Sequence, residues 1–316
     1  MQIKIISWRR HFNQSWFDIV YEWEDIIARI VSAKIIHHNI HAHRFLFLYN
    51  FFLSFGNKWI VNFVMNAKDK NNCNNRKTIP WIIDYYLEDD KLKDFENNFS
   101  KNPLILISSA EVYQYLKEKK ISLPIKHLAL SLPDQYKFRK IANKPYNLVV
   151  VGNQNPVLLG FLDRYTKEHP DFEYVFRTVE NGQYNCYTNT GKLVGNTNSH
   201  KDYIDLVSKA KVVLYTTKGI DSAAEHAHGY NQITPRFLEF MALGCHIIAR
   251  YKDNADSRYY EIDKIAPMCD TYETFCQQLN YYISHDIDYS LYDNYLAKHY
   301  TSVRAKQLLE ILKELD

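Results

Sequence analysis

The chain has 316 residues, of which 46% are hydrophobic, and its 39 basic and 36 acidic residues leave a net charge of only +3. This balance argues against a dedicated nucleic-acid-binding protein, so no nucleic-acid partner is expected. The length exceeds that of one typical domain, and two domains of about 150 residues each are expected. The five cysteines share no metal-ligand spacing, which favours a reducing cytoplasm over a disulfide framework.

The first half of the chain alternates between helical and strand patterns. Apolar spacing predicts a helix within residues 16–36, and the run 45–55, too short to span a bilayer, is interpreted as a buried helix. Further strands and helices are predicted over residues 59–65, 79–84, 90–99, 104–109, 110–118 and 125–130. Strands that alternate with helices indicate an α/β fold with a parallel sheet.

A polar stretch, 134–144, is the best linker candidate, so the boundary is placed after residue 142, giving domains 1–142 and 143–316. The second half repeats the strand–turn–helix pattern, and its polar segments 181–200 and 216–230 are interpreted as loops. The predicted elements there are 147–151, 158–167, 172–176, 203–209, 212–215, 272–282 and 302–315. This order indicates a Rossmann-like domain, which binds ligands at the carboxyl ends of its strands.

Residues 231–250 carry the most informative pattern in the chain. Thr234 is suited to cap a helix, Pro235 to occupy its first position and Gly244 to end it in a left-handed conformation. Glu239 falls about one turn inside this helix, with its side chain leaning back towards the N-terminus. A helix N-terminus attracts phosphate and a carboxylate can accept two ribose hydroxyls, so the pattern suits a nucleoside diphosphate.

The same helix resembles the donor-binding helix of GT-B glycosyltransferases. The family pattern R-x-x-E-x-x-A-x-G appears here as Arg236, Glu239, Ala242 and Gly244. The resemblance implies two Rossmann-like domains facing across a cleft, a nucleotide-sugar donor whose ribose binds Glu239, and a last helix that often crosses back to the first domain. The alternative for Glu239 is a solvated carboxylate on an ordinary core helix.

Many retaining members carry a second glutamate eight positions earlier, where this chain has Asn231. The resemblance therefore puts a retaining mechanism of that subtype in doubt, and Asn231 is expected to contact the sugar or the diphosphate instead. The loop before it, 216–231, is expected to line the donor sugar. Glu225, His226 and His228 in this loop match no common metal-site spacing.

Three more positions are candidates for the donor site. Gly152 and Asn153 follow a predicted strand, where backbone amides can approach a phosphate, although a plain turn explains them too. Arg177 follows the next predicted strand and either reaches the same cleft or pairs locally at the surface. Arg236, at the second helical position, is expected to place its charged fork beside the pyrophosphate. No convincing Asp-x-Asp motif is present, so a metal-independent enzyme without a cofactor is expected.

An inverting transferase needs a general base beside the acceptor hydroxyl. Asp84, at the end of a predicted buried strand, and His11, in an N-terminal loop, are the candidates. A strand-end acid can equally cap the following helix. The histidines at positions 37, 38, 41 and 43 are interpreted as the surface of an amphipathic helix.

The nearest look-alikes are bacterial transferases that build capsule or lipopolysaccharide glycans, together with CgeB-like spore-coat proteins. The resemblance implies a cytoplasmic hexosyl or related transferase that moves a sugar to a surface-glycan acceptor. Where that acceptor is lipid-linked, it implies weak peripheral association with the inner face of the membrane. The alternatives are a binding or assembly protein that keeps the fold without turnover, and a nucleotide-sugar epimerase.

Overall fold

The computed structural model describes residues 3–11, 17–37, 59–69 and 73–315. The chain forms two compact units, unit 1 with residues 1–134 and 299–316, and unit 2 with residues 135–298. The boundary expected after residue 142 therefore falls inside unit 2. The last helix belongs to unit 1, as the resemblance implied: α11, Thr301–Glu314, buries Ala305, Leu308 and Leu312 in the core of unit 1.

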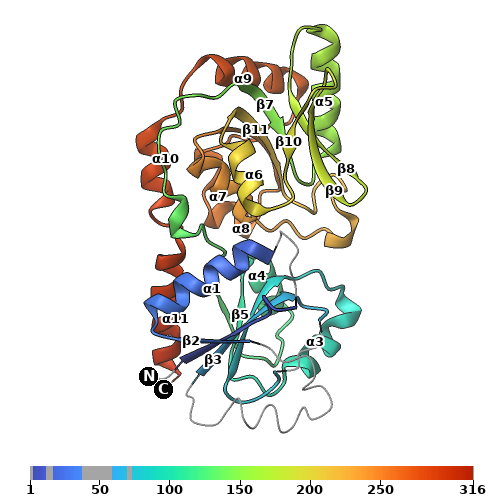
Figure 1. Ribbon diagram of the computed structural model, residues 1–316. Helices are drawn as coiled ribbons and strands as arrows, with labels where there is room; N and C mark the ends of the chain where they lie inside the picture. Colours follow the sequence, from blue (N-terminus) through green and yellow to red (C-terminus); the bar gives the residue numbers. More distant parts are fainter. Residues whose placement is uncertain (1–2, 12–16, 38–58, 70–72, 316) are drawn as a thin grey trace. The chain divides into compact units, whose positions relative to one another are not determined.

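Unit 1 is built on a six-stranded sheet in the order β2-β1-β3-β4-β5-β6, with every neighbouring pair parallel. The strands are β1 (Ile3–Ser7), β2 (Lys34–His37), β3 (Trp59–Asn66), β4 (Thr78–Asp84), β5 (Ile105–Ile107) and β6 (Ile125–His127). Its helices are α1 (Asp18–Ile30), α3 (Leu92–Phe99), α4 (Ala110–Glu118) and α11 (Figure 1).

The core of unit 1 fills one face of this sheet beneath α1 and α11. Apolar side chains of β1, β3 and β4 meet Trp23 and Ile27 of α1 and Leu308 of α11, and the indole of Trp81 stacks on Phe63 at 5.1 Å. The buried indole nitrogens of Trp23 and Trp81 donate to the carbonyls of Ser131 and Leu128. Their polar atoms are thus satisfied, so the rings stabilise the core without an unpaired donor.

Unit 2 contains a second six-stranded sheet in the order β10-β9-β8-β7-β11-β12. Strands β7, β8, β11 and β12 are parallel, whereas β9 and β10 add an antiparallel extension. The strands are β7 (Tyr146–Val150), β8 (Val175–Glu180), β9 (Gln183–Thr188), β10 (Leu193–Asn196), β11 (Ala210–Thr216) and β12 (His246–Arg250). The helices are α5 (Pro156–Glu168), α6 (His200–Val207), α7 (Pro235–Ala242), α8 (Ala255–Tyr259), α9 (Tyr272–Ser284) and α10 (Tyr289–Leu296).

Strand β11 shows how this sheet is covered on both faces. Val212 and Leu214 pack with α5 and α9, while the next side chain, Tyr215, packs against Phe237 of α7 with tilted rings whose centroids lie 5.3 Å apart. Alternate residues of a strand point to opposite faces, so a continuous apolar run is required where helices lie on both sides. Helix α7 is therefore fixed on the sheet by its apolar stripe.

Two predicted elements differ from the structure. The helix predicted within 16–36 stops at Ile30, and residues 34–37 form β2 after Ser32 adopts a left-handed φ of 54°. The segment 181–200, predicted as a loop, contains β9 and β10. Asn181 and Gly182 have φ values of 51° and 76°, which fit a type I′ hairpin turn between β8 and β9.

Two further predictions, the buried helix over 45–55 and the surface role of the histidines at 38, 41 and 43, lie outside the described residues. His37 is the exposed last residue of β2 rather than part of a helix. Among the described helices, none combines the length and apolar character needed to cross a membrane.

Candidate functional site

Helix α7 begins and ends where the sequence predicts. Thr234 occupies the N-cap position, Pro235 the first helical position, and Gly244 has a φ of 65° after the last turn. The Thr234 hydroxyl makes no capping hydrogen bond, contrary to expectation. Its backbone N–H instead donates to the buried Tyr215 hydroxyl at 3.0 Å, and burial raises the pKa of this phenol to about 12. The start of α7 is thus tied to the end of β11.

Glu239 is buried on α7, which excludes a solvated carboxylate. Its Oε1 lies 2.8 Å from Nε2 of His200, the first residue of α6. Tyr203, one turn further along α6, is half-buried, with its hydroxyl oxygen shielded from solvent. Burial and then the negative charge of Glu239 raise the pKa of Tyr203 well above its usual value. A carboxyl group in such a place must be paired or hydrogen-bonded, and His200 provides a partner.

Arg236 lies over the turn that follows β7. Gly152 in that turn has a φ of 80°, and a Cβ atom at this position would overlap the guanidinium group of Arg236. Two features therefore require glycine at position 152: the left-handed backbone conformation, and the space that the Arg236 side chain occupies. Asn153, the next residue, is exposed.

Arg177 belongs to β8 rather than following it, and the fold brings it to Arg236. Burial and then the positive charge of Arg236 lower the pKa of Arg177. Its guanidinium also lies over the ring of Tyr184 on β9, 4.7 Å from the centroid. In the described part of the chain neither arginine forms an ion pair with a carboxylate. The result is a half-buried pair of like charges beside Glu239 and Gly152.

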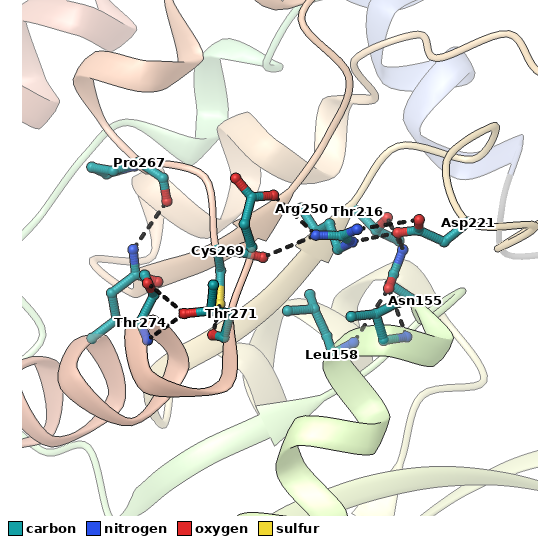
Figure 2. Close-up of polar contacts among 12 residues, drawn as sticks. Asn155, Leu158, Thr216, Asp221, Arg250, Pro267, Cys269, Thr271 and Thr274 are labelled. Atoms are coloured by element: carbon teal, nitrogen blue, oxygen red, sulfur yellow. Dashed lines mark hydrogen bonds and ion pairs between the residues drawn. The ribbon is translucent and has the colours of Figure 1, made fainter.

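The turn after β7 is fixed by a polar network (Figure 2). Buried Asn155 caps α5 by accepting hydrogen bonds from the backbone of Val157 and Leu158, and its amide nitrogen donates to Asp221 at 2.9 Å. Asp221 forms a two-point ion pair with Arg250 at the end of β12, and Arg250 reaches Asp270 at 3.0 Å. This network joins the loop after β11 to the loop after β7.

Replacing Asp221 should destabilise unit 2 through this network. Asp221→Ala leaves Arg250 and Asn155 without their shared partner and places alanine at a φ of 49°. We expect a loss of about 1–2 kcal/mol in the free energy of unfolding, less than for a fully buried pair because water still reaches both side chains. Denaturant unfolding measures it. In the matched control Asp253→Ala, which breaks an exposed pair with Arg258, little change is expected. Equal losses in the two variants would contradict this account.

The side chain of Asn231, which is expected from the sequence to contact the sugar or the diphosphate, is hydrogen-bonded within its own loop. Its Oδ1 accepts from the Thr217 hydroxyl at 2.7 Å, and its Nδ2 donates to the carbonyl of Gly229 at 2.7 Å. Its own carbonyl accepts from Asn254. Asn231 is buried, and these bonds make it a support for the loop 217–231.

In unit 1 the candidate bases lie at one edge of the sheet. His11 lies in the turn after β1, where its backbone N–H donates to the Trp8 carbonyl. Half-buried Asp84 is the last residue of β4, and β3 lies between β1 and β4 in the sheet. The capping role considered for Asp84 is not observed, because Glu88 and Lys91 precede the next helical turns.

Glu24 is a further ionisable group of unit 1, which the sequence analysis missed. It is buried on α1, with its Oε2 3.1 Å from Nη2 of Arg9, and burial raises its pKa to about 7 although Arg9 opposes the shift. A carboxyl group that titrates near neutral pH can exchange protons in that range. Glu24 therefore joins Asp84 and His11 as a candidate acid or base of unit 1.

Across the described ranges, no cluster of three or more His, Cys, Asp or Glu side chains is arranged to hold a metal ion. The loop with the short helical turn of Glu225 to Ala227, followed by His228 at a φ of 47°, contains no such cluster.

The comparisons with known proteins decide the family. Residues 138–310 match the family model described as glycosyl transferase-like. The chain belongs to this glycosyl transferase-like family. The matched segment includes Gly152, Arg177, His200, Arg236 and Glu239, so the whole arginine and glutamate cluster belongs to the glycosyltransferase domain. No curated protein matches the sequence significantly.

Solved structures extend the likeness to both units of this glycosyltransferase. Bacteriophage T4 β-glucosyltransferase aligns with a TM-score of 0.53 and 11% identity over 100% of this chain and 99% of that one. A putative UDP-N-acetylglucosamine 2-epimerase from Listeria monocytogenes also gives 0.53, with 10% identity over 99% and 95% of the two chains. At such identities the likeness concerns the fold, which is the GT-B fold expected from the sequence.

Proposed function

We propose that unit 2 binds the nucleoside diphosphate part of a nucleotide-sugar donor, with Arg236 and Arg177 at the diphosphate. The observation that carries this proposal is the pair of neighbouring guanidinium groups without a carboxylate partner in the described chain. Holding two like charges together, partly away from water, costs free energy that a bound anion would offset. Planar guanidinium forks match the oxygens of a diphosphate.

The backbone around the arginines supports the same ligand. The turn at Gly152 and Asn153 follows a parallel strand, where ligands of α/β sheets bind. The start of α7 at Thr234 contributes the positive end of a helix dipole. Glu239, one turn behind it, is the group we propose as the acceptor for the ribose hydroxyls.

The proposed chemistry is transfer of the sugar with release of a nucleoside diphosphate. The leaving diphosphate gains negative charge as the glycosidic bond breaks, so the two arginines would stabilise the transition state more than the bound donor. This electrostatic role supports a reaction that needs no metal ion. On the acceptor side, Asp84, His11 and Glu24 of unit 1 are the groups we propose for testing as the base.

For the acceptor, we propose a bacterial surface glycan such as capsule or lipopolysaccharide. This choice of acceptor is supported by the sequence resemblance of α7 to transferases of those pathways. Lipid-linked acceptors of that kind would bring the protein to the inner face of the membrane as a peripheral protein.

Turnover of a panel of nucleotide sugars tests the proposed function. The expected result is release of a nucleoside diphosphate from one donor, by hydrolysis or by transfer, at a rate that a chelator does not change. Conversion of the donor sugar without release of the diphosphate would instead identify an epimerase. Binding without any turnover, with surface-glycan acceptors present, would point to a binding or assembly protein.

A further inference from the structure

The position of the Glu239 carboxylate is set by a histidine from another helix. His200 Nε2 and Glu239 Oε1 are 2.8 Å apart, and the two side chains are only 10% and 6% exposed. His200 opens α6, and Glu239 lies in the second turn of α7. The contact therefore locks together two helices that pack on the same sheet.

The His200 ring is itself held in place by its neighbours. Its Nδ1 lies 3.3 Å from the hydroxyl of Tyr136, whose ring meets it edge-on at 5.4 Å. Tyr203 stacks on it at 5.9 Å with an interplanar angle of 14°. The start of α6 is fixed by a reciprocal capping box between Ser199 and Asp202. These contacts hold the imidazole ring of His200 in the orientation that directs Nε2 at Glu239.

A second observation points to a ligand beside this pair. The hydroxyl of Tyr203 is buried beside the Glu239 carboxylate and, among the described residues, makes no hydrogen bond of normal geometry. The charges of Glu239 and Arg236 both act on this hydroxyl. A buried hydroxyl without a partner carries a desolvation cost, which a ligand hydroxyl could remove.

We propose that His200 is a positioning residue that holds Glu239 for the ribose hydroxyls and so makes the site select ribonucleotides. This inference rests on the proposed nucleoside diphosphate site. His200 uses one carboxylate oxygen and leaves the remaining acceptor positions of Glu239 for the ribose. The Tyr203 hydroxyl supplies a further partner. A nucleotide without ribose hydroxyls would leave these buried groups unsatisfied, which is the basis of strong discrimination.

The test compares a ribonucleoside diphosphate with its 2′,3′-dideoxy form. Calorimetry on the wild type with ADP, GDP, CDP and UDP identifies the tightest ligand, whose dideoxy form is then measured. We expect the wild type to prefer the ribose form by roughly tenfold or more. His200→Phe keeps the ring but removes Nε2, so the preference should fall severalfold while affinity for the dideoxy form stays the same.

Two further variants keep the result decisive. Tyr136→Phe removes the hydroxyl at Nδ1 and should lower the same preference, even if His200→Phe does not fold. His169→Phe replaces a histidine that stacks on Tyr165 in the same unit and should leave the preference unchanged. An unchanged preference in both His200→Phe and Tyr136→Phe would overturn the inference alone. Failure of the wild type to bind any nucleoside diphosphate would overturn the proposed function, and the inference with it.

Discussion

Arg236→Ala should lower the affinity for the nucleoside diphosphate by about 10- to 100-fold, which corresponds to about 1.5–3 kcal/mol for a lost charged hydrogen bond. The protein without ligand should not be destabilised, because the substitution also removes the repulsion between Arg236 and Arg177. Loss of affinity without loss of stability is the signature of a residue kept for a ligand. Calorimetric titration and thermal unfolding of the same variant measure the two effects.

Two variants sharpen this prediction. Arg177→Ala should weaken binding in the same direction, and its affinity should depend less steeply on salt than that of the wild type. Arg164→Ala is the matched control, because Arg164 is exposed on α5 and pairs with Glu168. Its affinity should equal that of the wild type. A large fall in unfolding temperature for Arg236→Ala with unchanged affinity would assign this arginine to the fold instead of the donor.

Glu24 should make the stability of the protein depend on pH between about 4.5 and about 7. Its pKa rises on folding from the ordinary 4.5 to about 7, so the native state binds the proton more tightly than the unfolded state. The stabilisation is complete below pH 4.5 and is lost as pH rises through 7. The shift corresponds to about 3 kcal/mol. In Glu24→Gln this contribution should be absent.

The measurement is the difference in unfolding free energy between the wild type and Glu24→Gln across pH 4 to 8. We expect the wild type to lose stability relative to the variant as pH rises. Asp25→Asn is the control, because Asp25 contacts the same Arg9 but is exposed, so its difference from the wild type should not follow this course. Parallel curves for wild type and Glu24→Gln would contradict the raised pKa.

Helix α7 could be predicted from the sequence because its signals are local. Thr234, Pro235 and Gly244 mark its ends within eleven positions of one another, and each acts through its own backbone preferences. The one local error concerns the Thr234 side chain, whose capping bond does not form. The start of the helix is held instead by the Thr234 backbone N–H, which donates to Tyr215, a residue of a strand that no local pattern reveals.

The antiparallel extension of unit 2 was missed although the sequence contained a signal. Asn181-Gly182 is a strong hairpin dipeptide, since both residues tolerate a positive φ. The strands of the extension, β9 and β10, are mostly polar, with β9 largely half-buried and β10 largely exposed at the edge of the sheet. They therefore lack the apolar alternation by which half-buried strands are recognised.

The residues around Glu239 could be predicted only in part. Arg236 and Glu239 lie on one helix and share its pattern, whereas His200 is 39 positions away and meets Glu239 only through the fold. Arg177 and Arg236 are likewise joined by the order of the strands. The role expected for Asn231 comes from its position relative to Glu239 in the family motif. That position does not reveal that the Asn231 side chain is hydrogen-bonded to Thr217 and Gly229.

Calorimetric titration of the wild-type protein with ADP, GDP, CDP and UDP is the most direct test of the central claim, that unit 2 is a nucleoside diphosphate site. The account predicts saturable, base-selective binding of at least one of them, with an affinity that falls as salt rises. The absence of binding by all four, with a folded protein confirmed by thermal unfolding, would contradict it.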